Sequence, residues 1–335
     1  MDWVAVLWIP LIKAIVVVLL LLVGGAYMTW GERKLCARFQ VRYGPNMAGR
    51  FGVLQPLADA VKAIFKEEII PNHVDKIIYV MAPGISFAAV LITFAVIPFG
   101  PSVDLFGRQV NLLIGESNVG LLFLLAIAGL GGYGIILGGW SSNNKYSLLG
   151  AFRAAAQMIS YELPMGLALV AVVLIVGSLN LQEIVEFQGT WPLILLQPIG
   201  FLLFFIAILA ESNRSPFDLP ETENELVSGF MTEYGGIKFA LYFIAEYTAL
   251  VVNSAIVTTI FLGGWKWPAF ISDLHPLAGV GLFLSKVVFV LFLYVWIRAS
   301  VPRVRYDKFM RFCWKFFVPL ALANLTLTAF VVALL

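Results

Sequence analysis

Apolar residues occur along this chain in long unbroken stretches, separated by shorter segments that hold most of the charged side chains. Each stretch holds about 20 residues, which is enough for a helix to cross a hydrocarbon core of about 30 Å. Because the apolar runs are continuous rather than alternating, they indicate helices and not the strands of a membrane barrel. The pattern predicts eight membrane-spanning helices, at residues 3–30, 77–99, 117–140, 146–177, 192–211, 237–263, 277–298 and 316–335.

The composition agrees with a chain that lies mostly in a membrane. Hydrophobic residues make up 61% of the chain and charged residues 13%, and the mean hydropathy is +0.92. We therefore expect an all-α, polytopic membrane protein that folds as a single membrane domain over residues 1–335. The first span is too long for a signal-peptide core and has no small-residue cleavage site, so we expect it to be retained.

The basic residues predict how the chain is oriented. Most of the 22 lysines and arginines fall in the odd-numbered connections, around residues 31–76, 141–153, 212–238 and 298–315. By the positive-inside rule these connections face the cytoplasm, which places both termini on the other side of the cell's inner (plasma) membrane. The net charge is only +2, and the basic residues lie beside span ends, so nothing indicates nucleic-acid binding.

Neither the cysteines nor the histidines indicate a metal site. An iron–sulfur cluster usually takes four thiolates, and this chain has two cysteines, Cys36 and Cys313. The histidines, His73 and His275, fall on opposite sides of the membrane and cannot hold a haem between them. Residues 129–134 match the pattern G-x-G-x-x-G, but inside a predicted span this pattern is typical of closely packed helices. We expect no metal ligands and no covalently bound cofactor.

Ionisable residues interrupt several of the predicted spans. Glu162 and Glu246 lie about half-way along two of them, and Glu211 lies at the cytoplasmic end of a third. A charge at the centre of a bilayer costs about 2.5–3.5 kcal/mol or more, so these carboxyl groups must face protein or water. One interpretation is a structural ion pair, for example with Arg153. The other is a proton path, since a carboxyl group held away from water can load and release a proton near neutral pH.

The connection at residues 210–236 gathers acidic side chains beside one arginine, Arg214. Its acids are Glu211, Asp218, Glu221, Glu223, Glu225 and Glu233. Such a segment can be a solvated loop, but aromatic and aliphatic residues alternate with the acids here, which indicates packing against other parts of the protein. We expect a funnel of acids from the cytoplasmic face to mid-membrane. Thr222 and Glu225 match a capping box, which predicts a short helix after Thr222.

The first cytoplasmic connection contains an amphipathic segment at residues 54–71. Apolar side chains lie on one helical face and polar side chains largely on the other. The apolar face is formed by Leu57, Val61, Ile64 and Phe65. The pattern predicts a helix in the membrane interface, either as surface packing or as one wall of a lateral opening for a lipid-soluble substrate.

Four long motifs closely resemble the H-subunit family of proton-pumping NADH:quinone oxidoreductases, respiratory complex I, the counterpart of mitochondrial NADH dehydrogenase subunit 1. They are GERKLCARFQVRYGPNMAGRFGVLQPLADAVKAIFKE (31–67), SLLGAFRAAAQMISYELPMG (147–166), AESNRSPFDLPETENELVSGFMTEYGG (210–236) and RASVPRVRYDKFMRFCWK (298–315). The resemblance implies a quinone, ubiquinone or menaquinone, as substrate. It also implies that NADH, FMN and iron–sulfur clusters are bound by partner subunits.

The resemblance assigns roles to particular residues and partners. It implies that connections 31–76 and 210–238 form a quinone chamber and an acidic funnel. The chamber residues would be Glu32, Arg33, Asp59, Lys62, Phe217 and Asp218. The proton relay would be Glu162, Glu211, Glu221, Glu223, Glu225, Glu233 and Glu246. The expected partners are the peripheral quinone-site and terminal-cluster subunits, neighbouring membrane subunits and lipids.

Two other functions fit parts of the pattern. An equivalent membrane subunit of an ion-pumping hydrogenase or formate hydrogenlyase would keep the fold and need no quinone. A stand-alone secondary transporter would also use intramembrane carboxylates, but such proteins often contain inverted repeats, and the two halves of this chain show no internal repeat.

Overall fold

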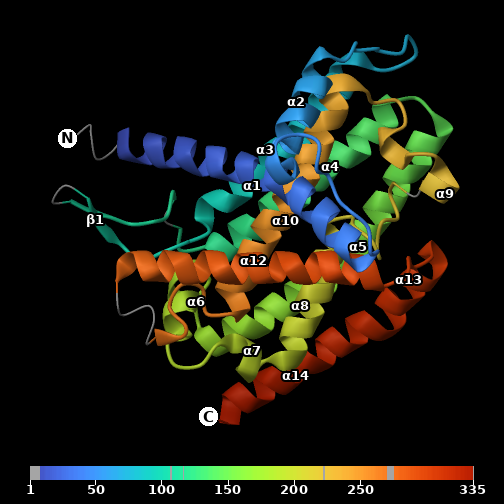
Figure 1. Cartoon of the computed structure of the whole chain (residues 1–335). Helices are drawn as coiled ribbons and strands as arrows, with labels where there is room; N and C mark the ends of the chain where they lie inside the picture. The colour runs from blue at the N-terminus through green and yellow to red at the C-terminus, as the bar shows by residue number, and fades with distance from the viewer. Residues whose placement is uncertain (1–7, 106–107, 116, 222, 270–274, 335) are drawn as a thin grey trace.

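The computed structural model describes residues 8–334 apart from 106–107, 116, 222 and 270–274, and for residues 103–105, 108–110 and 223–224 it describes the backbone alone. Long helices lie side by side and form the body of the molecule (Figure 1). The α-helices are α1 (Ile9–Phe39), α2 (Gln55–Phe65), α3 (Lys76–Thr93), α4 (Gly120–Ser141), α5 (Lys145–Val176), α6 (Leu181–Phe187), α7 (Leu193–Leu196), α8 (Pro198–Glu211), α9 (Glu223–Leu226), α10 (Gly236–Phe261), α12 (Pro276–Ser300), α13 (Tyr306–Phe312) and α14 (Val318–Leu334).

Short elements complete the described chain. The 3-10 turns are η2 (Arg50–Gly52), η3 (Phe94–Val96) and η4 (Gly229–Met231), and the π-helical turn η5 (Cys313–Phe317) joins α13 to α14. Two strands, β1 (Val103–Leu105) and β2 (Arg108–Val110), pair antiparallel with Val103 opposite Val110. Apart from this short hairpin, the regular elements that the structure describes are helical, in agreement with the expected all-α fold class. Pairing between residues so close in sequence requires only a short loop closure and no larger sheet.

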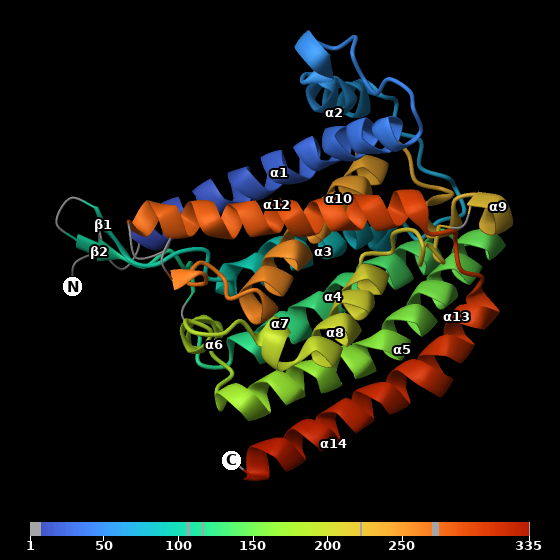
Figure 2. The same cartoon turned by 60° about the horizontal axis from the view of Figure 1, so that its bottom comes forward.

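Seven helices in the described residues are long and apolar enough to cross a membrane, so the chain is a polytopic membrane protein. They correspond to seven of the eight predicted spans. The remaining span, predicted at 192–211, forms two shorter helices, α7 and α8, which are separated at Gln197. In Figure 2, α8 leads from the end of the bundle that holds α6 toward the end that holds α9 and α13.

Helix α10 is the most completely buried of these seven long helices and packs against α1, α3 and α12. A side chain at Gly25 of α1 would overlap the hydroxyl of Thr248 on α10. Glycine at this position therefore allows the two helices to cross closely. This crossing carries α1 past α10, so that residues near the end of α1 reach the side chains of α10 and α12.

Two predicted boundaries change in the structure. Helix α1 continues to Phe39, so Glu32 and Arg33 are part of a helix and not of a loop that begins at residue 31. The amphipathic segment is helical only over Gln55–Phe65, and none of its residues is buried in this chain. The predicted apolar face of α2 is thus uncovered, with Leu57 62% exposed and Phe65 84% exposed.

Candidate functional site

The acidic connection after α8 is held against the bundle by Gln157 of α5, whose side chain is fully buried. The Gln157 amide nitrogen donates to the carbonyl oxygens of Ala210 (2.9 Å) and Phe217 (2.8 Å). A buried polar group that loses its partner costs about 1–3 kcal/mol, so these two bonds favour a fixed path for residues 210–217 along α5.

The acidic connection is also held by residues 301–309, which join α12 to α13 and include the first turn of α13. We call this segment the strap. Arg303 of the strap contacts Asp218 twice. Its guanidinium donates to the Asp218 carbonyl oxygen, and one nitrogen lies 3.3 Å from the Asp218 carboxylate. The ring of Phe217 packs against the ring of Phe309, with 5.1 Å between centroids. The strap therefore fixes two consecutive residues of the acidic connection.

Arg214 enters the bundle from this connection and is only 8% exposed. Its Nη2 atom lies 3.3 Å from Oε2 of Glu246 on α10, and the guanidinium lies over the Tyr247 ring, 4.0 Å from the centroid. Burial alone would lower the pKa of Arg214, but the adjacent Glu246 carboxylate raises it above its ordinary value. Arg214 therefore stays charged and places a permanent cation beside Glu246.

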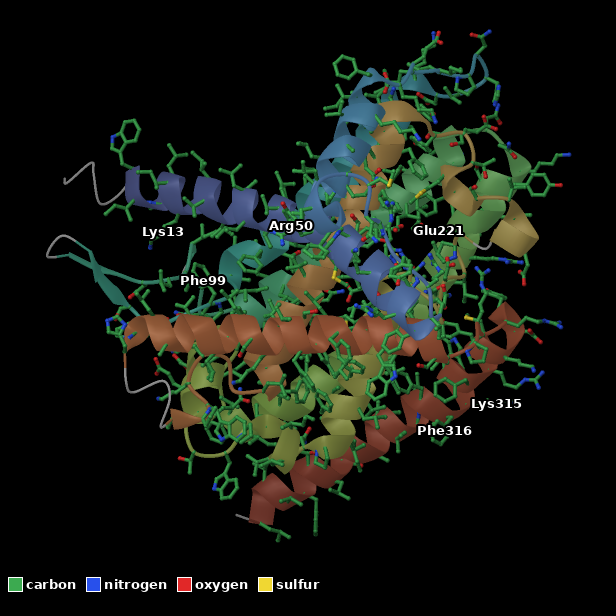
Figure 3. All side chains as sticks on the ribbon, in the orientation of Figure 1. Lys13, Arg50, Phe99, Glu221, Lys315 and Phe316 are labelled. Atoms are coloured by element: carbon green, nitrogen blue, oxygen red, sulfur yellow. The ribbon has the colours of Figure 1, made fainter. Side chains whose placement is uncertain are left out.

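The carboxyl group of Glu246 has one oxygen, Oε2, beside the Arg214 cation. Its other oxygen, Oε1, is buried and has no hydrogen-bond partner among the described residues, so it can still accept a hydrogen bond. Glu221 lies on the same connection as Arg214. Figure 3 places Glu221 near α9, at the opposite end of the molecule from Lys13.

The network continues from α10 to α1 and α12. The Tyr247 hydroxyl lies 3.4 Å from Nη1 of Arg214 and 3.4 Å from Oε1 of Glu32. Glu32 is 6% exposed and forms an ion pair with Arg298. Glu32, Arg214 and Arg298 border a cavity of about 10 Å³, which is close to the smallest space that can hold one water molecule. A continuous set of polar groups therefore connects Glu246 to Glu32.

Two cavities meet at Glu211, the last residue of α8. One of about 100 Å³ is bordered by Glu211 and Glu246. The other, of about 430 Å³, is bordered by Glu211 and Glu162. Both exceed the space of about 10–15 Å³ that one water requires, and both contain polar groups that can bind water. Three carboxyl groups from α5, α8 and α10 thus face two neighbouring cavities.

Glu162 lies at the outer surface of α5, where the larger cavity opens. Arg153, which the sequence offered as a structural partner for an intramembrane carboxylate, forms its ion pair with Glu225, at 2.5 Å. Among the described residues, neither Glu162 nor Glu211 is joined to a basic side chain by an ion pair. Glu246 has its cation, Arg214, and still borders a cavity.

The remaining predicted relay residues lie apart from this cluster. Glu225 is held by Arg153, and its side chain is 42% exposed. Glu233 accepts a hydrogen bond from the Asn144 amide at 2.6 Å, beside the turn between α4 and α5. Glu223 begins α9, and its side chain lies outside the described part of the chain.

The predicted chamber residues do not form one cluster in this chain. Arg33 of α1 pairs with Asp59 of α2 at 2.8 Å, and both side chains are about two-fifths exposed, at 42% and 41%. Lys62 is exposed on the same helix. Glu32 lies inside the bundle with Arg298, whereas Phe217 and Asp218 contact the strap.

Three residues that support the site were not predicted as part of it: Gln157, Arg298 and Arg303. In the sequence, Arg298 and Arg303 served only to predict the orientation of the chain in the membrane. Both lie in the motif 298–315, and this position already indicated that they contribute to the functional site. Gln157 lies in the motif 147–166, but only the fold brings it to the carbonyl groups of Ala210 and Phe217. Among the described residues, no group of three or more His, Cys, Asp or Glu side chains is arranged to hold a metal ion.

Comparison with known proteins settles the family. Residues 12–329 match the family described as NADH dehydrogenase. The chain belongs to the NADH dehydrogenase family. Similar curated proteins include the second NADH-quinone oxidoreductase H subunit of Syntrophobacter fumaroxidans, which is 48% identical over 328 residues, covering 98% of this chain and 97% of that protein. The resemblance that the four sequence motifs indicated is thereby confirmed.

Other members of the NADH dehydrogenase family show the same similarity. The first NADH-quinone oxidoreductase H subunit of Geobacter sulfurreducens is 49% identical over 335 residues, covering 96% of this chain and 94% of that protein. The corresponding H subunit of Thermomicrobium roseum is 50% identical over 316 residues, covering 91% of each chain. All the candidate site residues described above fall inside the range that matches the family.

Proposed function

We propose that this chain is the membrane subunit of a proton-translocating NADH:quinone oxidoreductase that forms the quinone access path and couples quinone reduction to proton movement through buried carboxyl groups. Family membership and the activity for which the relatives are named support the reaction. Partner subunits would bind NADH, FMN and the iron–sulfur clusters, and neighbouring membrane subunits would receive the protons.

The observation that carries the proton-coupling part is the pair of cavities that share Glu211. A proton path needs titratable groups separated by spaces that admit water. Glu162, Glu211 and Glu246 satisfy this requirement in order, and Arg214 links Glu246 to the cytoplasmic connection.

The coupling itself can be electrostatic. Quinone reduction changes the charge at the cytoplasmic end of the bundle, where Glu32, Arg298 and Arg214 lie. Two unit charges about 8 Å apart interact by roughly 2 kcal/mol at an effective dielectric constant near 20. That energy changes a protonation equilibrium by about 30-fold, which is enough to move one proton along a chain of carboxyl groups that are close to balance.

The uncovered face of α2 supports a role at the membrane surface. Its apolar side chains are exposed in this chain, which fits a helix that lies in the interface beside an opening for a lipid-soluble quinone. Asp59 and Lys62 on its polar side, together with Arg33 of α1, would then contribute to a chamber that partner subunits complete.

In this proposal the chain lies in the inner membrane with eight crossings, of which α7 and α8 together form the fifth. The first described turn of α1 and the last turn of α14 lie at the same end of the bundle (Figure 2), as an even number of crossings requires. The positive-inside rule places that end on the non-cytoplasmic side.

Substitution of Glu211 tests the proposal in the assembled complex. We expect Glu211→Gln to lower both NADH:quinone reduction and proton uptake into inverted membrane vesicles, because both cavities lose the titratable group that they share. Glu183→Gln, at an exposed position on α6, is the matched control and should behave as wild type. Wild-type reduction and wild-type proton uptake in Glu211→Gln would show that the relay assignment is wrong.

The alternative, a membrane subunit of an ion-pumping hydrogenase or formate hydrogenlyase, is distinguished by its partners. Our proposal predicts that the tagged chain purifies with a flavin-containing, NADH-oxidising module. Purification with a nickel–iron subunit would favour the alternative.

A further inference from the structure

Met158 of α5 lies at the boundary between the two cavities described above. Its side chain borders both the cavity that contains Glu162 and the cavity that contains Glu246. Within the described part of the chain, two other residues, Ala128 and Glu211, border both. Of these three, Met158 alone has a long apolar side chain, so it is the group whose position decides whether the two spaces are continuous.

The end of the Met158 side chain occupies a notch in α4. A side chain at Gly132 would overlap the Met158 thioether and its methyl group. One turn earlier on α4, a side chain at Gly129 would come within 3.4 Å of the Glu162 carboxylate. Met158 and Glu162 are four residues apart, so both lie on the same face of α5. The glycines of the motif at 129–134 therefore provide the space in which these two side chains lie.

The backbone beside Met158 is fixed, whereas the Met158 side chain is of a flexible type. The preceding residue, Gln157, holds α5 to the acidic connection through its bonds to Ala210 and Phe217. Methionine is unbranched, with three rotatable side-chain bonds, and adapts to irregular spaces more easily than leucine or phenylalanine. A change of rotamer can therefore move the thioether out of the Gly132 notch without moving either helix.

We propose that Met158 is an apolar gate that separates the Glu162 cavity from the Glu246 cavity and opens when its side chain leaves the Gly132 notch. The proposal rests on the proton relay of the proposed function and assigns to Met158 a positioning role in it. While the thioether lies in the notch, an apolar group interrupts the hydrated route between the cavities. When it leaves, water can connect Glu162 with Glu246 through Glu211.

Two substitutions on different helices test the gate in the assembled complex. Met158→Ala removes the barrier, and Gly132→Ala displaces it from the notch. Each should lower severalfold the number of protons taken up per NADH oxidised in inverted vesicles, because proton exchange between the cavities no longer waits for quinone reduction. The double variant should lower this ratio no further than either single change, since both act on the same barrier.

The controls separate a gate from a general defect. Met158→Leu keeps an apolar side chain of similar volume and should keep the ratio. Val170→Ala, at an exposed position of α5 that borders neither cavity, should keep it as well. The same vesicles should hold a gradient generated by ATP hydrolysis as well as wild-type vesicles do, which excludes leaky membranes. A wild-type ratio in both Met158→Ala and Gly132→Ala would overturn the gate.

Glu211→Gln, measured in parallel, distinguishes failure of the gate from failure of the relay. If Glu211→Gln lowers proton uptake while both gate variants keep the wild-type ratio, the relay stands and the gate is wrong. If Glu211→Gln leaves proton uptake unchanged, the proposed function itself fails, and the gate fails with it.

Discussion

The ion pair between Arg214 and Glu246 offers a quantitative test of how the acidic connection is attached to the bundle. The two charged groups are 3.3 Å apart, and each side chain is 10% exposed. At an effective dielectric constant of about 20, unit charges at this separation attract each other by roughly 5 kcal/mol. Removing one partner of such a buried pair leaves the other uncompensated and costs about 3–5 kcal/mol.

We therefore expect Arg214→Met to destabilise the purified complex by about 3–5 kcal/mol in a detergent-denaturation titration. Glu246→Gln combined with Arg214→Met should recover part of that loss, because the double variant no longer buries an unpaired carboxylate. The matched control is Arg305→Met. Arg305 also pairs with an acid, Asp307 at 2.8 Å, but the two side chains are 72% and 49% exposed, so its loss should cost about 0–1 kcal/mol.

The double-mutant cycle decides the interpretation. If the losses of Arg214→Met and Glu246→Gln add to within about 0.5 kcal/mol, the two groups are energetically independent and the attachment through this pair is refuted. If Arg214→Met costs no more than Arg305→Met, the burial of Arg214 in the native complex is refuted as well.

Two further predictions concern contacts on either side of the network. Arg303→Ala should lower kcat/KM for quinone reduction about tenfold, because the strap loses its charged contacts with Asp218. Arg303→Lys should restore part of the lost kcat/KM. Equal values of kcat/KM for wild type, Arg303→Ala and Arg303→Lys would contradict a role for the strap. Lys286 of α12 donates to the carbonyl oxygens of Leu262 (2.6 Å), Gly264 (2.8 Å) and Trp267 (2.5 Å). Lys286→Met should destabilise the complex by about 1–3 kcal/mol, because the three carbonyl oxygens lose their hydrogen-bond donor. An unchanged denaturation midpoint would contradict the predicted loss of stability.

The membrane spans could be predicted from the sequence because they depend on a local property. A run of apolar residues must form a helix in lipid wherever it occurs, and seven of the eight predicted runs do form long helices. The break at Gln197 was not predictable in the same way. The buried Gln197 amide donates to the hydroxyl of Thr328 on α14, a partner that is far away in the sequence.

The candidate site was predictable in its residue types but not in its pairings. Glu162, Glu211 and Glu246 stood out because a carboxyl group inside an apolar run is costly and needs a reason. Which of them has a cation depends on how α10 is turned toward Arg214, and that orientation is set by packing against α1, α3 and α12. For the same reason, the structure assigns Glu32 to Arg298 and not to its sequence neighbours on α1 and α2.

In the proposed relay, Glu211 exchanges a proton in response to quinone reduction. Infrared difference spectra of the assembled complex, recorded between the oxidised and the quinol-reduced state, measure this directly through the stretching band of a protonated carboxyl group. We predict a carboxyl band in the wild-type difference spectrum that is absent from the spectrum of Glu211→Gln and present in that of Glu183→Gln. Identical carboxyl bands in wild type and Glu211→Gln would show that Glu211 exchanges no proton when the quinone is reduced.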